Sequence, residues 1–128
     1  MPNYTITNLK QVEDAAAGRG PGVEARFGRT HLGTEHLGVS YFRYEPGFRA
    51  PFGHHHKEQE EVYVVIGGSG RVKLDDEVIE LQPWDAVRVA PEVVRGFEGG
   101  PEGLEVIAVG ADRPEGGDGV MVKDWWTD

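Results

Sequence analysis

The chain has 128 residues, a size typical of one domain, and its hydrophobic content of 38% is that of an ordinary globular protein. Its 22 acidic side chains outnumber the 13 basic ones, and the formal net charge of −9 disfavours nucleic acid as a partner because a phosphate backbone would be repelled. The absence of cysteine excludes disulfides, thiol nucleophiles and thiolate metal ligands.

Residues 1–36 predict little regular structure, apart from one helical turn within residues 8–17, and we treat them as an N-terminal arm. The first five residues lack the basic and apolar regions of a signal peptide. The longest wholly apolar run, residues 62–66, is too short to cross a membrane. We therefore expect a cytoplasmic protein with no membrane partner.

The rest of the chain predicts β-strands separated by turns rich in Gly, Pro and Asp. The predicted strands cover residues 37–44, 61–66, 71–74, 77–81, 87–89 and 104–109. Residues 67–70, Gly-Gly-Ser-Gly, are expected to be a turn that ends one strand, and residues 99–101 are expected to separate the last two. The two strands on either side of Asp75 and Asp76 predict a hairpin. Short strands at this spacing indicate an all-β antiparallel sandwich or barrel.

The end of the chain combines a predicted loop, residues 110–119, with two large apolar rings, Trp125 and Trp126. Two tryptophans are costly to leave in water. We therefore expect the tail to fold back onto the barrel or onto a partner subunit.

The chemistry of the sequence is concentrated in residues 54–61. Residues two apart in an extended segment point to the same face, so His54 and His56 share a face and His55 points away. Glu61 opens the next strand and can supply a carboxylate to the same centre, with Glu60 as the rival. The alternative is that three consecutive histidines form an exposed polar stretch. The pair followed by a carboxylate favours a metal site.

These residues resemble the first motif of the cupin family, in which a glycine precedes His-x-His, Glu follows four residues later, and Gly comes six residues after that. His54, His56, Glu61 and Gly68 match, although Gly47 lies one residue further from His54 than the usual pattern has it. The likeness covers about residues 37–110.

The resemblance implies an all-β, double-stranded β-helix (jelly-roll type) cupin barrel in one domain, residues 1–128. Its core would be about residues 37–110, with the N-terminal arm at 1–36 and a C-terminal tail at 111–128. It also implies a divalent metal ion (Fe, Mn, Ni, Zn or Cu) inside the barrel and a homodimer. Dimerisation would agree with the apolar C-terminal tail, which carries Trp125 and Trp126.

The second cupin motif is absent. Aligned on Phe97, its Gly, Pro, Gly, His and Asn positions hold Trp84, Ala90, Glu92, Arg95 and Gly99. Arg95 takes the place of the fourth metal ligand, and an arginine has no lone pair to give a cation. A fixed positive charge there would also weaken metal binding.

Three arrangements follow. His54, His56 and Glu61 hold a metal alone, or Arg95 replaces the metal and pairs with Glu61 or Glu60, or Arg95 clamps an anionic ligand. A shifted register, with Arg95 in solvent, is a fourth interpretation. Tyr63 and Phe97 are expected pocket walls by strand parity, although core packing explains them too.

We therefore expect a small cupin that binds a divalent metal and a small organic ligand, with no assigned reaction. The alternatives are a metal-dependent dioxygenase or isomerase acting on a small polar substrate, and a metal-free ligand-binding module built on Arg95. Because cupins perform many chemistries, the fold favours none of these.

Overall fold

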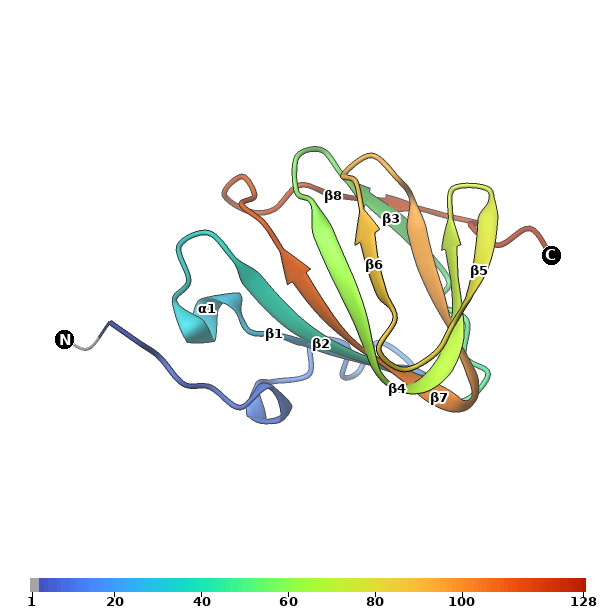
Figure 1. Cartoon of the computed structure of the whole chain (residues 1–128), viewed down its shortest axis with the longest axis horizontal. Helices are drawn as coiled ribbons and strands as arrows, with labels where there is room; N and C mark the ends of the chain where they lie inside the picture. The colour runs from blue at the N-terminus through green and yellow to red at the C-terminus, as the bar shows by residue number, and fades with distance from the viewer. Residues whose placement is uncertain (1–2) are drawn as a thin grey trace.

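The computed structural model describes residues 3–128, and residues 1–2 of the predicted N-terminal arm lie outside it. Eight strands form one curled antiparallel sheet, and the all-β class is confirmed (Figure 1). The strands are β1 (Val23–Phe27), β2 (Gly38–Tyr44), β3 (Gly53–His56), β4 (Glu61–Leu74), β5 (Glu77–Leu81), β6 (Ala86–Val89), β7 (Arg95–Gly110) and β8 (Gly119–Val122). The helical segments of the described residues are short, η1 (Leu9–Gln11) and α1 (Arg29–Leu32), and neither is long and apolar enough to span a membrane.

Strand β7 lies at the centre of the topology, because it pairs with β2, β3 and β4. The remaining strands extend the sheet from these: β1 pairs with β2, β8 with β3, and both β5 and β6 with β4. The β4–β5 pairing confirms the predicted hairpin. Glu61, the first residue of β4, pairs with Gly110 at the end of β7, whereas His54 of β3 pairs with Arg95 at its start. The curl of the sheet therefore brings Glu61 near the histidines of β3 (Figure 1).

Two predicted turns are wrong, because β4 and β7 each run unbroken through them. Residues 67–70 lie inside β4, where the register against β7 shifts between Val65 and Gly67 and again between Gly68 and Gly70. Such bulges bend a strand without ending it. The glycines that suggested a turn therefore carry one long strand around the curve of the barrel, and residues 99–101 lie in the same way within β7.

Strands β1 and β8 lie outside the predicted barrel core of residues 37–110. Strand β1 pairs with β2 over five residues, and β8 pairs with β3 over four. The second pairing matters for the site, because β3 contacts β7 at a single pair of residues, His54 and Arg95, within the part of the chain that the structure describes. Strand β8 therefore provides most of the pairing that keeps β3 extended.

The interior of the curled sheet is filled by apolar side chains, and three aromatic rings form its centre. The ring of Phe97 lies 4.9 Å from that of Tyr63 and 5.8 Å from that of Tyr44, measured between ring centroids. Tyr63 and Phe97 are each only 3% exposed. The cluster adjoins the polar residues of the interior, because the hydroxyl of Tyr63 donates to Glu61.

The tail folds back onto the barrel of its own chain. Trp125 packs against the backbone of Gly53 and Gly96, and the ammonium of Lys73 lies 4.0 Å from the centre of its ring. The Trp126 Nε1 donates to the carbonyl of Ala50 at 2.9 Å. Since both rings are engaged in this way, the tail gives little support to a dimer, and the homodimer stays a prediction.

Substitution of Gly68 by alanine is expected to destabilise the fold strongly. Gly68 has a φ of +69°, and a Cβ there would lie 2.0 Å from the carbonyl oxygen of Gly103 in the paired strand. Backbone strain of about 1–2 kcal/mol and an overpacking penalty of about 1–3 kcal/mol should add. Urea denaturation gives the free energy of unfolding.

Gly116→Ala is the matched control, because Gly116 has a φ of +84° but a Cβ added there would meet no atom of residues 3–128 within 4 Å. It should lose only the strain, about 1–2 kcal/mol. Equal losses in the two variants would contradict the close approach of β4 and β7.

Candidate functional site

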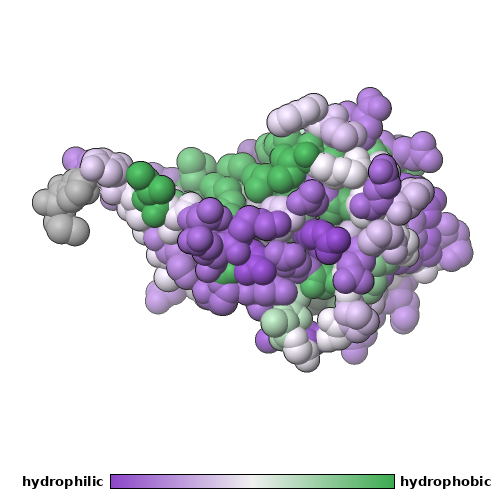
Figure 2. Space-filling model, turned by 90° about the horizontal axis from the view of Figure 1, so that it is seen from below, coloured by the Kyte–Doolittle hydropathy of each residue, from purple (hydrophilic) through white to green (hydrophobic). Residues whose placement is uncertain are grey.

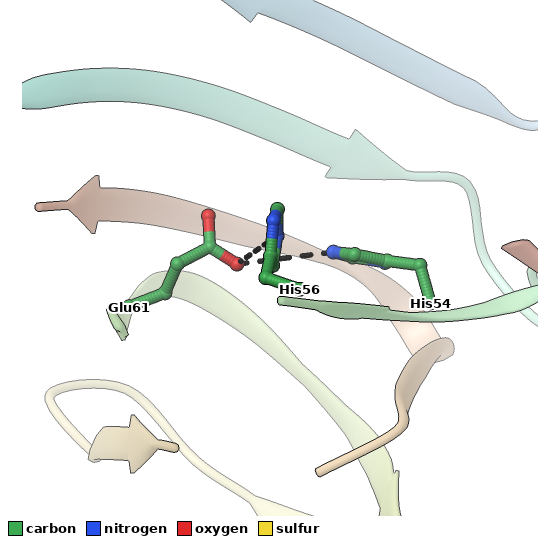
Figure 3. A group of neighbouring side chains, drawn as sticks. All are labelled: His54, His56 and Glu61. Carbon is green, nitrogen blue, oxygen red and sulfur yellow. Dashed lines mark ion pairs between the residues drawn. The ribbon is translucent and has the colours of Figure 1, made fainter. Parts of the chain in front are cut away.

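Three polar side chains converge inside the barrel: His54 and His56 from β3 and Glu61 from the first position of β4 (Figure 3). The Oε1 atom of Glu61 lies 3.8 Å from His54 Nε2 and 3.1 Å from His56 Nε2. One ligand atom from each residue lies within 4.8 Å of the other two. Ligand atoms around a metal with bonds of about 2.1 Å are separated by roughly 3.0–3.4 Å, so this arrangement can hold an ion after small side-chain adjustments.

His56 is held by a carboxylate that the sequence analysis missed. Asp118 is buried, and one of its oxygens lies 2.8 Å from His56 Nδ1. The other accepts the backbone N–H groups of Glu58 and Gln59 at 2.7 and 2.8 Å. When Nδ1–H donates a hydrogen bond to Asp118, the lone pair of Nε2 faces the centre. This buried nitrogen lies 3.1 Å from Glu61 Oε1 but makes no hydrogen bond within residues 3–128.

Sequence spacing gave no signal for Asp118, which lies 62 residues from His56 in a stretch that resembles an ordinary loop. Its pKa is lowered to about 2. Burial acts in the opposite direction, but the hydrogen bonds from Glu58, His56 and Gln59 outweigh it. Asp118 is therefore ionised across the physiological range and can orient the imidazole.

Glu61 receives several contacts on one oxygen. Besides the two histidines, the hydroxyl of Tyr63 donates to Oε1 at 2.5 Å. Burial would raise the pKa of Glu61, but His54, His56 and Tyr63 together hold it well below its usual range. Glu61 is therefore ionised although it is half-buried. A carboxyl group must be ionised to act as a metal ligand.

The pKa of His56 is raised above its usual value. The contact with Glu61 is the largest cause, burial opposes it, and Asp118 adds to the increase. In the metal-free protein the imidazole therefore retains its proton to a higher pH than a free histidine does.

Arg95 lies in the interior, as the aligned register predicted, and not in solvent. Its side chain is completely buried, and its Cα is paired with that of His54 across β7 and β3. Nη1 donates to the carbonyl of Val93 at 2.9 Å, while Nη2 lies 3.6 Å from Glu61 Oε1. Neither Nη2 nor Nε has a hydrogen-bond partner in the described part of the chain.

The other predicted pocket residues divide into two groups. Tyr63 and Phe97 line a cavity of about 920 Å³ together with His54, His56, Glu61 and Arg95. Glu60 does not reach it, because its exposed carboxylate lies 3.3 Å from Arg88 Nη1 on the outside. Glu60 and Glu61 are adjacent in an extended segment, so only one of them can face the interior.

The comparisons with known proteins agree with this geometry. The family described as "Cupin domain" matches residues 40–110, which is more than half of the chain. No curated protein matches the chain in sequence.

Solved structures share the fold. A cupin protein from Bacteroides fragilis is 24% identical, with a TM-score of 0.68 over 100% of this chain and 91% of that one. The polyketide cyclase RemF from Streptomyces resistomycificus is 22% identical, with a TM-score of 0.72 over 97% and 87%. Oxalate decarboxylase from Bacillus subtilis is 23% identical, with a TM-score of 0.76 over 94% of this chain but only 34% of that larger one. At these identities the likeness shows the double-stranded β-helix fold alone.

Replacing Asp118 with asparagine is expected to weaken divalent-metal binding about 10- to 100-fold. An amide can present its NH₂ group to His56 Nδ1, which favours the tautomer that has a proton on Nε2. Titration of the chelator-treated protein with Mn²⁺ in a calorimeter measures the affinity.

Asp112→Asn is the control for this change, because Asp112 is an exposed aspartate that lies 3.1 Å from a different histidine, His36. The affinity should be unchanged in this variant. If both variants bound Mn²⁺ as the parent does, Asp118 would have no part in positioning His56.

The metal-free protein is expected to lose stability as the pH rises above about 6.5. The folded-state pKa of His56 is raised, so its stabilising contribution is fully present below the unfolded value and disappears as the pH passes through the folded value. Urea denaturation between pH 6 and 9, with a chelator present, measures this slope.

His56→Gln should show a smaller decline over the same range, because glutamine does not titrate. His55→Gln is the control and should keep the parent slope. An identical slope in the parent and in His56→Gln would contradict the raised pKa.

Proposed function

Because the chain belongs to the cupin family, we propose that it binds a divalent metal ion through His54, His56 and Glu61 and a small organic ligand in the cavity beside them. The observation that carries this proposal is the convergence of the three side chains on one point. They come from two strands, and they line a cavity large enough for an organic molecule.

The residues present fit a metal. Two imidazoles and one carboxylate suit Fe, Mn, Ni, Zn or Cu, and three protein ligands leave coordination positions open for water or a ligand. His56 Nε2 is buried without a hydrogen-bond partner from the described residues, and a metal would give its lone pair one. Arg95 does not fill the fourth position, since it has no lone pair to donate.

When bound, the metal would supply Lewis-acid polarisation of a ligand oxygen and charge stabilisation. The side chains of this chain have separate roles around it. Asp118 orients His56, and the hydroxyl of Tyr63 holds the Glu61 carboxylate. Phe97, a buried apolar residue of the wall, lowers the local dielectric beside these groups and so strengthens their electrostatic interactions.

A second candidate function is a metal-free binding module, and the approach of Arg95 Nη2 to Glu61 Oε1 at 3.6 Å favours it. In this arrangement the guanidinium balances the carboxylate in place of a metal. Titration with metal separates the two candidates, because the module would bind none.

The fold does not specify a reaction. The structural neighbours include a polyketide cyclase and an oxalate decarboxylase, which differ in chemistry. The dioxygenase or isomerase expected from the family resemblance would use the same three ligands and open positions, so metal binding is the first property to establish.

The chelator-treated protein, purified without a nickel column, is expected to bind one equivalent of Mn²⁺ in calorimetric titration. Glu61→Gln and His56→Gln should each lower the affinity at least about tenfold, because each change weakens or removes one of three ligands. His55→Gln should leave it unchanged, because His55 is the neighbouring histidine outside the cluster.

Absence of Mn²⁺ binding, with Zn²⁺ and Fe²⁺ also failing to bind, would favour the metal-free module. Equal losses in His55→Gln and His56→Gln would show that binding does not use the proposed face of β3.

A further inference from the structure

We infer that the organic ligand is a carboxylic acid with a largely apolar, aromatic-sized body, and that Arg95 is the residue that selects its negative charge. This inference deepens the proposed function and rests on it for the place of the ligand. It stands on the charges of the cavity wall, the unpartnered edge of Arg95 and the apolar lining.

The cavity carries a charge opposite to that of the whole protein. The chain has 22 acidic and 13 basic side chains, yet among the described residues the charged side chains of the wall are four arginines and a single carboxylate, that of Glu61. The arginines are Arg19, Arg29, Arg95 and Arg113. An acidic protein with a basic cavity repels anions from its general surface and attracts them to one place.

Arg95 is the deepest of these charges, and its position is fixed. Its Nη1 donates to the carbonyl of Val93 at 2.9 Å and lies 3.4 and 3.5 Å from the carbonyl oxygens of His54 and Pro91. These contacts leave Nε and Nη2, the two nitrogens of one edge of the guanidinium, buried and without hydrogen-bond partners anywhere in residues 3–128.

An unpartnered edge of this kind is costly in a protein interior, and its geometry matches the two oxygens of one carboxylate. Glu61 does not satisfy it, because its Oε1 lies 3.6 Å from Nη2 and already accepts from Tyr63. Both nitrogens are closed to solvent in this structure, so an oxyanion reaches this edge only after the side chains over it move aside, and it then supplies the missing acceptors. In the low dielectric of the cavity, the positive charge attracts an anion strongly even before direct contact.

Metal binding adds to the demand for an anion. A divalent ion, the carboxylates of Glu61 and Asp118 and the guanidinium of Arg95 leave a local charge of +1 when the two histidines are neutral. A ligand that brings a carboxylate lowers this charge, whereas a neutral ligand does not.

The rest of the wall is apolar and aromatic. All five phenylalanines of the chain line the cavity: Phe27, Phe42, Phe48, Phe52 and Phe97. Phe27, Phe52 and Met121 are 50%, 41% and 63% exposed, so large apolar side chains of the wall are open to solvent. Figure 2 shows hydrophobic residues gathered on one face beside the N-terminal segment, with hydrophilic residues around them.

This lining favours an apolar body over a sugar. Away from the candidate metal ligands, Tyr63 and the arginines, few side chains of the described wall can pair with hydroxyl groups: Tyr44, Thr30, Ser40 and Gln59. A cavity of about 920 Å³ is also far larger than a two-carbon dicarboxylate needs. Exposed aromatic area removed from water would provide most of the affinity, and Arg95 would provide the selectivity for charge.

The test measures binding of 1-naphthoate to the chelator-treated and the Mn²⁺-loaded protein, by calorimetry or by the fluorescence of the probe. We expect 1-naphthoate to bind at least about tenfold more tightly than its neutral analogue 1-naphthalenemethanol. Oxalate, which has the charge without the apolar body, should bind more weakly than 1-naphthoate, and so should 1-naphthyl phosphate.

Arg95→Met should remove most of the preference for 1-naphthoate over the alcohol, and Arg95→Lys should retain part of it, because lysine keeps the charge without the planar edge. Arg88→Met is the matched control, since Arg88 is an exposed arginine outside the cavity. The double variant Arg19→Gln, Arg113→Gln changes only exposed residues of the wall and should weaken 1-naphthoate a few-fold without endangering the fold.

Equal binding of naphthoate and alcohol, or an unchanged preference in both Arg95→Met and the double variant, would overturn the inference. Tighter binding of oxalate would contradict the apolar body, and tighter binding of naphthyl phosphate would contradict the carboxylate. Failure of the proposed metal function is distinguishable, because 1-naphthoate would then still bind the chelator-treated protein in a manner that depends on Arg95.

Discussion

The carboxylate of Glu61 is the interaction on which the polar centre of this barrel depends. Its Oε1 lies within 4 Å of polar atoms of His54, His56, Tyr63 and Arg95, which come from three different strands. Without that negative charge, a fully buried guanidinium and an imidazole with a raised pKa would lie side by side in a largely apolar interior. Breaking such a buried pair is strongly destabilising, since it leaves a charge without compensation. The negative charge of Glu61 is therefore needed both for the candidate site and for the stability of the fold.

The same requirement explains why the supporting residues are distributed as they are. Asp118 Oδ1 lies at hydrogen-bond distance from His56 Nδ1, and Asp118 Oδ2 accepts the backbone N–H groups of Glu58 and Gln59. The backbone that precedes Glu61 is thereby tied to the segment that leads into β8. Because β8 also pairs with β3, one short region of the chain fixes both the orientation of an imidazole and the strand that carries it. A polar cluster of this kind is useful only when each member is held in place.

The charge of the cavity wall is opposite in sign to the net charge of the protein, so the overall composition does not predict it. The whole chain is acidic, whereas the wall of the cavity is basic and aromatic. In the proposed mode of binding, the arginines attract an anion to the cavity, and the phenylalanines of the wall bury the apolar body of the bound molecule. A metal at His54, His56 and Glu61 would strengthen the attraction and leave its sign unchanged. The proposed metal ligands and the residues proposed to recognise the organic ligand are different side chains, but all of them line the same cavity.

The amino-acid sequence by itself determined the class of the fold and the centre of the site. Aromatic and β-branched residues predicted strands at 37–44 and 61–66. The His-x-His spacing placed His54 and His56 on a common face, because strand periodicity is a local property, and Glu61 opened the next predicted strand. The register that placed Arg95 in the interior came from the comparison with the second cupin motif, aligned on Phe97. Other features depended on contacts between distant segments. The glycines at 67–70 look like a turn locally, and only pairing with β7 makes them part of a bent strand. Asp118 and β8 carry no local signal, and the cavity arises where arginines and phenylalanines from remote parts of the chain meet. The tertiary structure decided these features, since each depends on which surfaces pack together and not on the residues next to one another in the chain.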